Sequence, residues 1–325
     1  MKLLRREFMH LVAGAATLAA SSRIARAQVY PTRPVRIIDP FPPGGVSDIL
    51  ARLIGQKLSG RLGQPFVIEN RPGGATNIAT EAVVRAAPDG YTLLLVSPSN
   101  MINATLYDKL NFNFIRDIAP VASLMRTPLV MLVNPSVPAK TVLEFIAYAK
   151  ANPGKLNMAS DGIGSSGHVA GELFEMMAGV DMTTVPYRGA PPALIDLISG
   201  RVQIMFAPMP PALAHIRAGK LRALAVTTGV RAAALSDVPT LGDFLPGYEA
   251  SVLNGIGAPK NTPSEIINKL NTAINAVVAD PATKAKLATL GGMVVSGSPA
   301  DFGKLIAEET EKWAKVVRAA NIKPD

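Results

Sequence analysis

The feature that most constrains the fold is a repeated alternation of short apolar segments with amphipathic helical segments. In the helix expected over 47–58, apolar side chains recur at helical spacing, and residues 168–177 show the same pattern. Alternation of this kind predicts an α/β protein with largely parallel sheets and helices on both faces. Strands are expected at residues 35–39, 66–69, 92–96, 129–134, 156–159, 184–186, 202–206 and 221–227.

The order of these segments indicates two α/β units followed by a mostly helical end. From residue 264 onward the pattern is helical, with helix starts at Asp280-Pro281 and Ser298-Pro299. No low-complexity linker separates the two units. We therefore expect two domains that are joined by crossing strands, with the crossings near residues 125–129 and 249–253.

The first 27 residues have the form of an export signal. Lys2, Arg5 and Arg6 precede an uncharged apolar run at 11–20, and an A-x-A cleavage site ends at Ala27. The apolar run is too short to span a membrane, and no later segment is long enough. The paired arginines also fit a twin-arginine signal, so both export routes stay open. We expect cleavage after Ala27 and a periplasmic protein.

Composition excludes several classes of function. The chain has no cysteine, which excludes disulfides, thiolate metal ligands and cysteine nucleophiles. It also has no HExxH motif, so no zinc site is expected. We expect no cofactor. The signal holds five basic residues and one acidic residue, so its removal lowers the net charge from +9 to +5. The remaining charges are scattered without basic runs, which argues against a nucleic-acid partner.

A glycine-rich turn separates the first strand from the first helix. Pro42-Pro43-Gly44-Gly45 lies where an open parallel sheet binds its ligands, at the carboxyl end of a strand. Glycines let backbone N–H groups approach an anion, and the helix start adds a partial positive charge. The stretch is neither GxGxxG nor a P-loop, so a carboxylate suits it better than a phosphate. A tight turn with no ligand is an equally good interpretation of the turn by itself.

Two further loops repeat this design in the second α/β unit. Residues 160–168, SDGIGSSGH, supply serine hydroxyls before a helix, although a simple N-cap with spare glycines would have the same sequence. Residues 185–192 place Arg188 and Gly189 before another helix. A catalytic dyad of Ser165 and His168, as in a serine hydrolase, is a distant alternative because both would lie on one helical turn. No catalytic residue is assigned.

Five ordered segments resemble the substrate-binding proteins of tripartite tricarboxylate transporters, the Bug (TctC-type) family. They are PFPPGGVSDILARLIGQKLSGRLGQPFVIENRPGG, SDGIGSSGHVAGELF, VPYRGAPPALIDLISGRV, GKLRALAVTT and LSDVPTLGDFLPGYE, and they cover nearly the whole mature chain. The resemblance implies a type II periplasmic-binding-protein fold, with two doubly wound α/β domains around a ligand cleft. The implied boundaries are 28–125 with 252–325 for domain 1, and 126–251 for domain 2.

The resemblance also implies a function and a set of site residues. The expected protein is not an enzyme: it captures a small organic carboxylate between its domains, as a monomer, and delivers it to the transporter's membrane permease. A receptor that docks on a two-component sensor kinase is the alternative. The ligand-binding residues implied for the first domain are Phe41, Pro43, Gly44, Gly45, Asp48, Asn77 and Ser97, with Asp48 ordering the loop. Those implied for the second domain are Ser160, Gly164, Ser165, His168, Arg188, Gly189 and Phe206.

The chain departs from the family pattern in two places. Gly74-Ala75-Thr76-Asn77 stands where the family favours more glycine, so this loop is expected to approach a ligand differently. After Tyr248 the family commonly has an aromatic pair, whereas this chain has Val252-Leu253-Asn254. Smaller side chains there would reshape the cleft and shift ligand preference.

Overall fold

A computed structural model describes residues 30–324, and the predicted export signal lies outside this range. The first half of the chain alternates strands and helices as the sequence predicts. Its elements are β1 (Val35–Asp39), α2 (Val46–Leu62), β2 (Phe66–Asn70), η2 (Gly74–Thr76), α3 (Asn77–Val84), β3 (Thr92–Val96), α4 (Pro98–Leu106), α5 (Phe114–Asp117) and β4 (Ile118–Val133). The predicted bounds of β1 and β3 agree with the structure.

The second α/β unit follows β4 and ends where the chain returns through β9. Its elements are α6 (Val142–Ala151), β5 (Asn157–Ser160), α7 (Ser166–Ala178), β6 (Thr183–Pro186), α8 (Ala190–Ser199), β7 (Ile204–Pro208), α9 (Met209–Arg217), β8 (Arg222–Val226), η3 (Ala233–Leu235), η4 (Leu241–Asp243) and β9 (Ser251–Pro259). The helical end consists of α10 (Ser264–Ala279), α11 (Pro281–Thr289), the short β10 (Met293–Val294) and α12 (Pro299–Ala319).

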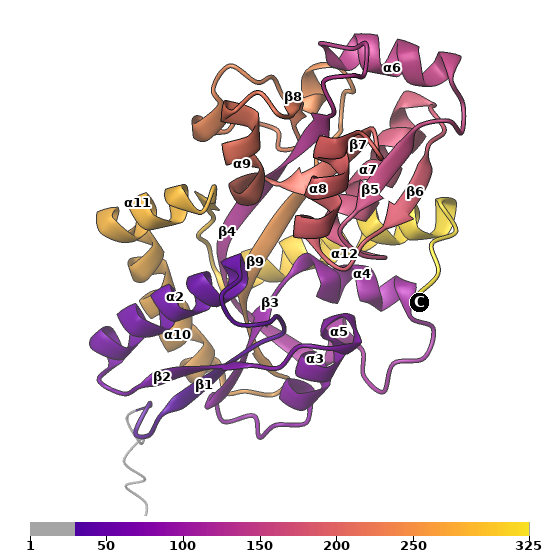
Figure 1. Cartoon of the computed structure of the whole chain (residues 1–325). Helices are drawn as coiled ribbons and strands as arrows, with labels where there is room; N and C mark the ends of the chain where they lie inside the picture. Colours follow the sequence, from indigo (N-terminus) through magenta and orange to yellow (C-terminus); the bar gives the residue numbers. More distant parts are fainter. Residues whose placement is uncertain (1–29, 325) are drawn as a thin grey trace, which may run out of the picture.

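One curled mixed sheet runs through both units in the order β2-β1-β3-β9-β4-β7-β5-β6. The strands at each end are parallel, as predicted: β1 pairs with β2 and β3, and β5 pairs with β6 and β7. The centre is antiparallel because the chain leaves the first unit through β4 and returns through β9. Figure 1 shows these two strands running between the indigo and purple half and the red and orange half.

The strand predicted at 129–134 is only the end of a much longer one. Residues 118–128 of β4 pair with β9, and residues 129–133 pair with β7. Residues 118–128 were not predicted as part of the strand, because Pro120 and Pro128 interrupt the apolar pattern. Two register shifts also break the alternation of inward and outward side chains. The domain boundaries at 125/126 and 251/252 stay a prediction.

The core is continuous across the crossing strands. One cluster of buried side chains includes Ile38 and Leu94 from the first unit together with Met131 and Phe174 from the second. Two further clusters each lie within one unit, on β1, β3, α2 and α10, and on β7, α8 and α9. Helix α12 packs against both α4 and β4. The sheet and α12 therefore hold the strand ends in fixed positions, and these ends carry the loops of interest.

Candidate functional site

The turn between β1 and α2 ends in a glycine, which occupies the N-cap position of the helix. Gly45 is the N-cap of α2, with φ −77° and ψ 173°, and no side chain caps the helix there. Gly44 adopts φ +86°, which favours glycine because L residues rarely reach this region. Pro43, Gly44 and Gly45 are all exposed to solvent. The turn therefore presents the uncapped start of a seventeen-residue helix to the outside.

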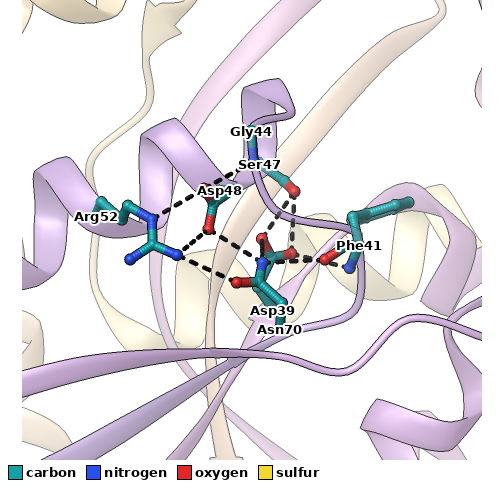
Figure 2. Close-up of polar contacts among 7 residues, drawn as sticks. All are labelled: Asp39, Phe41, Gly44, Ser47, Asp48, Arg52 and Asn70. Atoms are coloured by element: carbon teal, nitrogen blue, oxygen red, sulfur yellow. Dashed lines mark hydrogen bonds and ion pairs between the residues drawn. The ribbon is translucent and has the colours of Figure 1, made fainter.

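Asp48 holds this turn in place from the first turn of α2. Its Oδ2 accepts hydrogen bonds from the Gly44 N–H at 3.0 Å and from Arg52 Nε at 2.9 Å. Its Oδ1 accepts from Asn70 Nδ2 at 3.0 Å (Figure 2). The hydrogen bond from Arg52 is the largest of the influences that lower the pKa of Asp48 to about 2. Asp48 is therefore ionised at neutral pH and orders the loop, with both oxygens occupied by the protein.

A second carboxylate, Asp39, lies beneath the same turn and is fully buried. It accepts hydrogen bonds from the Phe41 N–H at 3.2 Å, from Ser47 Oγ at 3.0 Å and from Asn70 Nδ2 at 3.1 Å (Figure 2). Burial is the main reason that the pKa of Asp39 rises to about 6, and the neighbouring Asp48 also raises it. The two acids thus have opposite pKa shifts within one small network.

The sequence reading missed the roles of Asp39, Ser47 and Asn70. The available signal was the aspartate that ends the apolar strand VRIID, since a charged residue at a buried strand end needs partners. Asn70 ends β2, and its amide bridges Asp39, Asp48 and the Phe41 carbonyl oxygen. This bridge forms because β1 and β2 pair in parallel register with Asp39 opposite Asn70.

The turn between β2 and α3 carries unusual backbone conformations. Ala75 has φ +49° and Thr76 has φ +79°, although neither is glycine. The family resemblance favours glycine in this stretch, and the backbone here has the geometry that glycine adopts without strain. Asn77 lies beside this turn, and its Oδ1 accepts a hydrogen bond from Asn103 Nδ2 at 3.1 Å.

Ser97 lies at the carboxyl end of β3 and is the N-cap of α4. Its side chain is 1 % exposed and forms a capping box with Asn100. Ser97 Oγ lies 3.2 Å from Asn100 Oδ1, so the hydroxyl already has a partner within the protein. Ser97 is therefore placed at the predicted edge of the sheet, where it caps a helix.

The Gly/Ser loop of the second unit connects β5 to α7. Ser160 Oγ donates to the Gly162 carbonyl oxygen at 2.8 Å, and Ser165 is the N-cap of α7. Ser165 Oγ also donates to Asp161 Oδ1. Burial raises the pKa of the Asp161 carboxyl. Gly164 has φ +69° and lies so close to the Leu106 side chain of α4 that a Cβ atom would clash with it.

His168 has both ring nitrogens engaged within the second unit. Its Nδ1 accepts from the Gly164 N–H at 3.0 Å, and its Nε2 lies 3.3 Å from Glu172 Oε1. The Ser165 hydroxyl accepts from the backbone N–H of His168 and is not hydrogen-bonded to the imidazole. Ser165 and His168 therefore lack the nucleophile–base hydrogen bond of a serine hydrolase in this structure.

The remaining predicted residues of the second unit differ in exposure. Arg188 is exposed, and within residues 30–324 no hydrogen bond or ion pair involves its guanidinium group. Gly189, with φ +103°, is the N-cap of α8. Phe206 is fully buried against Phe174, with ring centroids 5.6 Å apart, so its side chain supports β7 from the core.

The predicted residues thus form two groups at carboxyl ends of strands. The first group follows β1, β2 and β3, and the second lies at the ends of β5 and β6, except Phe206, which lies within β7. Cavities of about 490 and 410 Å³ lie elsewhere, beside the C-terminal end of α4, and a third of about 320 Å³ lies between α6 and β8. Among the described residues, no group of three or more His, Asp or Glu side chains is placed to hold a metal ion. No helix within residues 30–324 is long and apolar enough to cross a membrane.

Comparison with known proteins gives a consistent result. The sequence profile of the tripartite tricarboxylate transporter family receptor matches residues 50–322. Protein BugT of Bordetella pertussis is 37% identical over 300 residues, which cover 91% of this chain and 92% of BugT.

Two similar structures were solved with dicarboxylates. R. palustris Rpa4515 with adipate has a TM-score of 0.81 and 38% identity, covering 91% of this chain and all of that one. MatC from Rhodopseudomonas palustris with bound malate has a TM-score of 0.76 and 33% identity, covering 89% of this chain and all of that one. These likenesses confirm the two-domain periplasmic-binding-protein fold, and the chain belongs to the tripartite tricarboxylate transporter receptor (TctC, Bug) family of solute-binding proteins.

Proposed function

We propose that this protein captures a small organic carboxylate, with a dicarboxylate as the best candidate, between its two α/β units. The observation that carries the proposal is the uncapped, exposed start of α2 at Gly45, in a chain whose relatives were solved with adipate and malate. Backbone N–H groups of a first helical turn, together with the helix dipole, favour an anion at this position. The only backbone N–H group among the described residues that donates to the Asp48 side chain is that of Gly44, so the N–H groups of the first turn of α2 stay available to a ligand.

The two groups of loop residues would hold opposite ends of the ligand. On the first side we assign Phe41, Pro43, Gly44 and Gly45 to the ligand, with Asp48 as the residue that orders the turn. Asn77 and Ser97 complete this side, although both already have partners within the protein.

On the second side, Arg188 is the best candidate to pair with a second carboxylate, because its guanidinium group is exposed and has no partner within residues 30–324. Ser160, Gly164, Ser165 and Gly189 shape the loops beside it. His168 and Phe206 support these loops from within, since His168 Nδ1 accepts a hydrogen bond from Gly164, its Nε2 lies beside Glu172, and Phe206 is fully buried.

Export and delivery to a permease complete the proposal. The signal at residues 1–27 would send the chain to the periplasm, and the family to which it belongs consists of transporter receptors. We propose no catalytic step. The Ser165 hydroxyl donates to Asp161 and not to the His168 imidazole, so the Ser–His hydrogen bond of a serine hydrolase is not formed in the Gly/Ser loop of this structure.

The test is a binding screen with the mature protein. Monocarboxylates, dicarboxylates including adipate and malate, and tricarboxylates are tested by thermal shift, and the compounds that shift the melting temperature are then measured by calorimetry. A ligand at one hundred times its Kd stabilises the protein by about 2.7 kcal/mol, which gives a clear shift. Ligand that is carried through purification is identified by mass spectrometry after denaturation. The proposal fails if folded, ligand-free protein responds to no carboxylate in the panel.

A further inference from the structure

A serine and a buried acid lie together directly under the proposed anion position. Ser47 is the second residue of α2, and its Oγ lies 3.0 Å from both carboxylate oxygens of Asp39. Asp39 is fully buried, whereas Ser47 is partly exposed in the first helical turn. Ser47 therefore stands between the buried carboxylate and the exposed start of the helix.

The Ser47 hydroxyl has one proton to donate, and Asp39 now receives it. A hydroxyl group carries one donor and two acceptor positions, and it rotates to suit its partners. As long as Asp39 is ionised, it accepts the Ser47 proton, and the hydroxyl is turned inward. If Asp39 carries a proton, its own O–H donates to Ser47 Oγ, and the Ser47 O–H is released to point outward.

We propose that Ser47 is a further ligand-binding residue, and that Asp39 is the positioning residue which turns the Ser47 hydroxyl toward the ligand when a proton is taken up on binding. This inference rests on the proposed capture of a carboxylate at the start of α2. The proton comes from solvent and is held on an Asp39 oxygen. The Ser47 O–H then donates to a ligand carboxylate oxygen, and no covalent bond other than those to protons changes.

The electrostatics of the site favour the same coupling. An ionised Asp39 repels a ligand carboxylate that lies above it, whereas a neutral Asp39 does not. The charged groups that act on Asp39 are Asp48 and Arg52 of α2, and these two pair with each other. From β2 the amide of Asn70 faces it, and Glu69 beside Asn70 is paired with Arg71. None of these partners supplies a net positive charge that would compensate both Asp39 and the ligand.

The expected pH dependence follows from linkage. The pKa of Asp39 is already raised to about 6 by burial, and an anionic ligand nearby raises it further. Affinity is then constant well below pH 6, falls as the pH rises from the pKa of Asp39 in the free protein to its higher pKa in the complex, and is constant again above that. Each unit by which the ligand raises this pKa corresponds to about a tenfold loss of affinity at high pH. For a rise of one unit we expect about fivefold weaker binding at pH 8 than at pH 6, and about tenfold weaker binding than at low pH, where Asp39 is fully protonated.

The experiment compares wild type with Asp39→Asn and Ser47→Ala by calorimetry from pH 5.5 to pH 8. The probes are adipate and malate, with any other carboxylate that the screen identifies. Repeating each titration in buffers of different ionisation enthalpy counts the protons that are taken up. Asp39→Asn is the matched control, because its amide N–H can donate to Ser47 without titrating. Titration of the ligand and of other residues is common to both proteins.

On binding ligand near pH 7, wild type should take up a fraction of a proton, and Asp39→Asn should lack this uptake. At pH 8, Asp39→Asn should bind the ligand about tenfold more tightly than wild type does. Ser47→Ala should bind at least about fivefold more weakly than wild type at pH 5.5, where the hydroxyl faces the ligand. The inference is overturned if wild type and Asp39→Asn have the same pH profile, or if Ser47→Ala binds like wild type at pH 5.5. The second comparison still decides the matter if Asp39→Asn does not fold. Failure of all carboxylates to bind wild type at any pH would instead refute the proposed function.

Discussion

The position of the anion can be tested by placing a charge at Gly45. The backbone of Gly45, with φ −77° and ψ 173°, has the extended conformation of an N-cap residue, which any L residue adopts. A Cβ atom added there would meet only the Pro42 carbonyl oxygen, at the ordinary contact distance of 3.7 Å. Gly45→Asp and Gly45→Asn should therefore both fold. Asn and Asp are both better N-caps than glycine, and the free energy of unfolding should stay within about 1 kcal/mol of wild type.

The two variants differ in charge alone, and this difference sets the expected loss of affinity. A carboxylate at residue 45 would lie about 5 Å from a ligand carboxylate at the same helix start. At an effective dielectric constant of 20, two charges at this distance repel by about 3 kcal/mol. Screening by salt in an open site reduces this value, but even half of it weakens binding more than tenfold. Gly45→Asn should also lose affinity, because its side chain occupies the N–H groups that the ligand would use.

The assay is calorimetric titration at pH 7 with the tightest carboxylate found for wild type, alongside chemical denaturation of each variant. We expect the order of affinity to be wild type, then Gly45→Asn, then Gly45→Asp, with at least a tenfold step between the two variants. A folded Gly45→Asp protein that keeps the wild-type Kd would show that no anion binds at the start of α2. The turn would then serve only to connect β1 with α2.

Three further predictions concern stability. Gly44→Ala should lower the free energy of unfolding by roughly 1–2 kcal/mol, because φ is +86° although the space around it is open, whereas the control Gly60→Ala within α2 should not destabilise. Glu309→Ala should lower the free energy of unfolding by about 3 kcal/mol, because it removes the nearer of the two carboxylates that pair with the mostly buried Arg126, at 3.0 Å against 3.5 Å for Glu249; combining Glu309→Leu with Arg126→Met should recover most of this loss. Burial, with a smaller contribution from Glu172, raises the pKa of Glu175 to about 8, so wild-type stability should fall as the pH rises from about 4.5 to about 8. Denaturation curves across this range should be flatter for Glu175→Gln, and equal slopes would contradict the assignment.

Local sequence patterns predicted the elements that are short, apolar and clearly bounded. Strands β1 and β3 were predicted with their observed limits, because each is a buried run that ends at a turn or a helix start. Strand β9 was not read as a strand of this length. Its Gly255 and Gly257 break the apolar pattern, and only the fold explains them: a Cβ at Gly255 would clash with Phe302 of α12, and one at Gly257 with Ile118 of β4.

For the candidate site, the sequence by itself determined the turn and its suitability for an anion. Two prolines, two glycines and a helix start are neighbours in the chain, so their effect on the backbone is local. The tertiary structure decided what lies beneath the turn. Asp39 meets Asn70, thirty-one residues later, because β1 and β2 pair in register, and no local pattern encodes that meeting. The same pairing buries a carboxylate below the proposed anion position, and this burial is the physical reason for our proposal that its proton takes part in ligand capture.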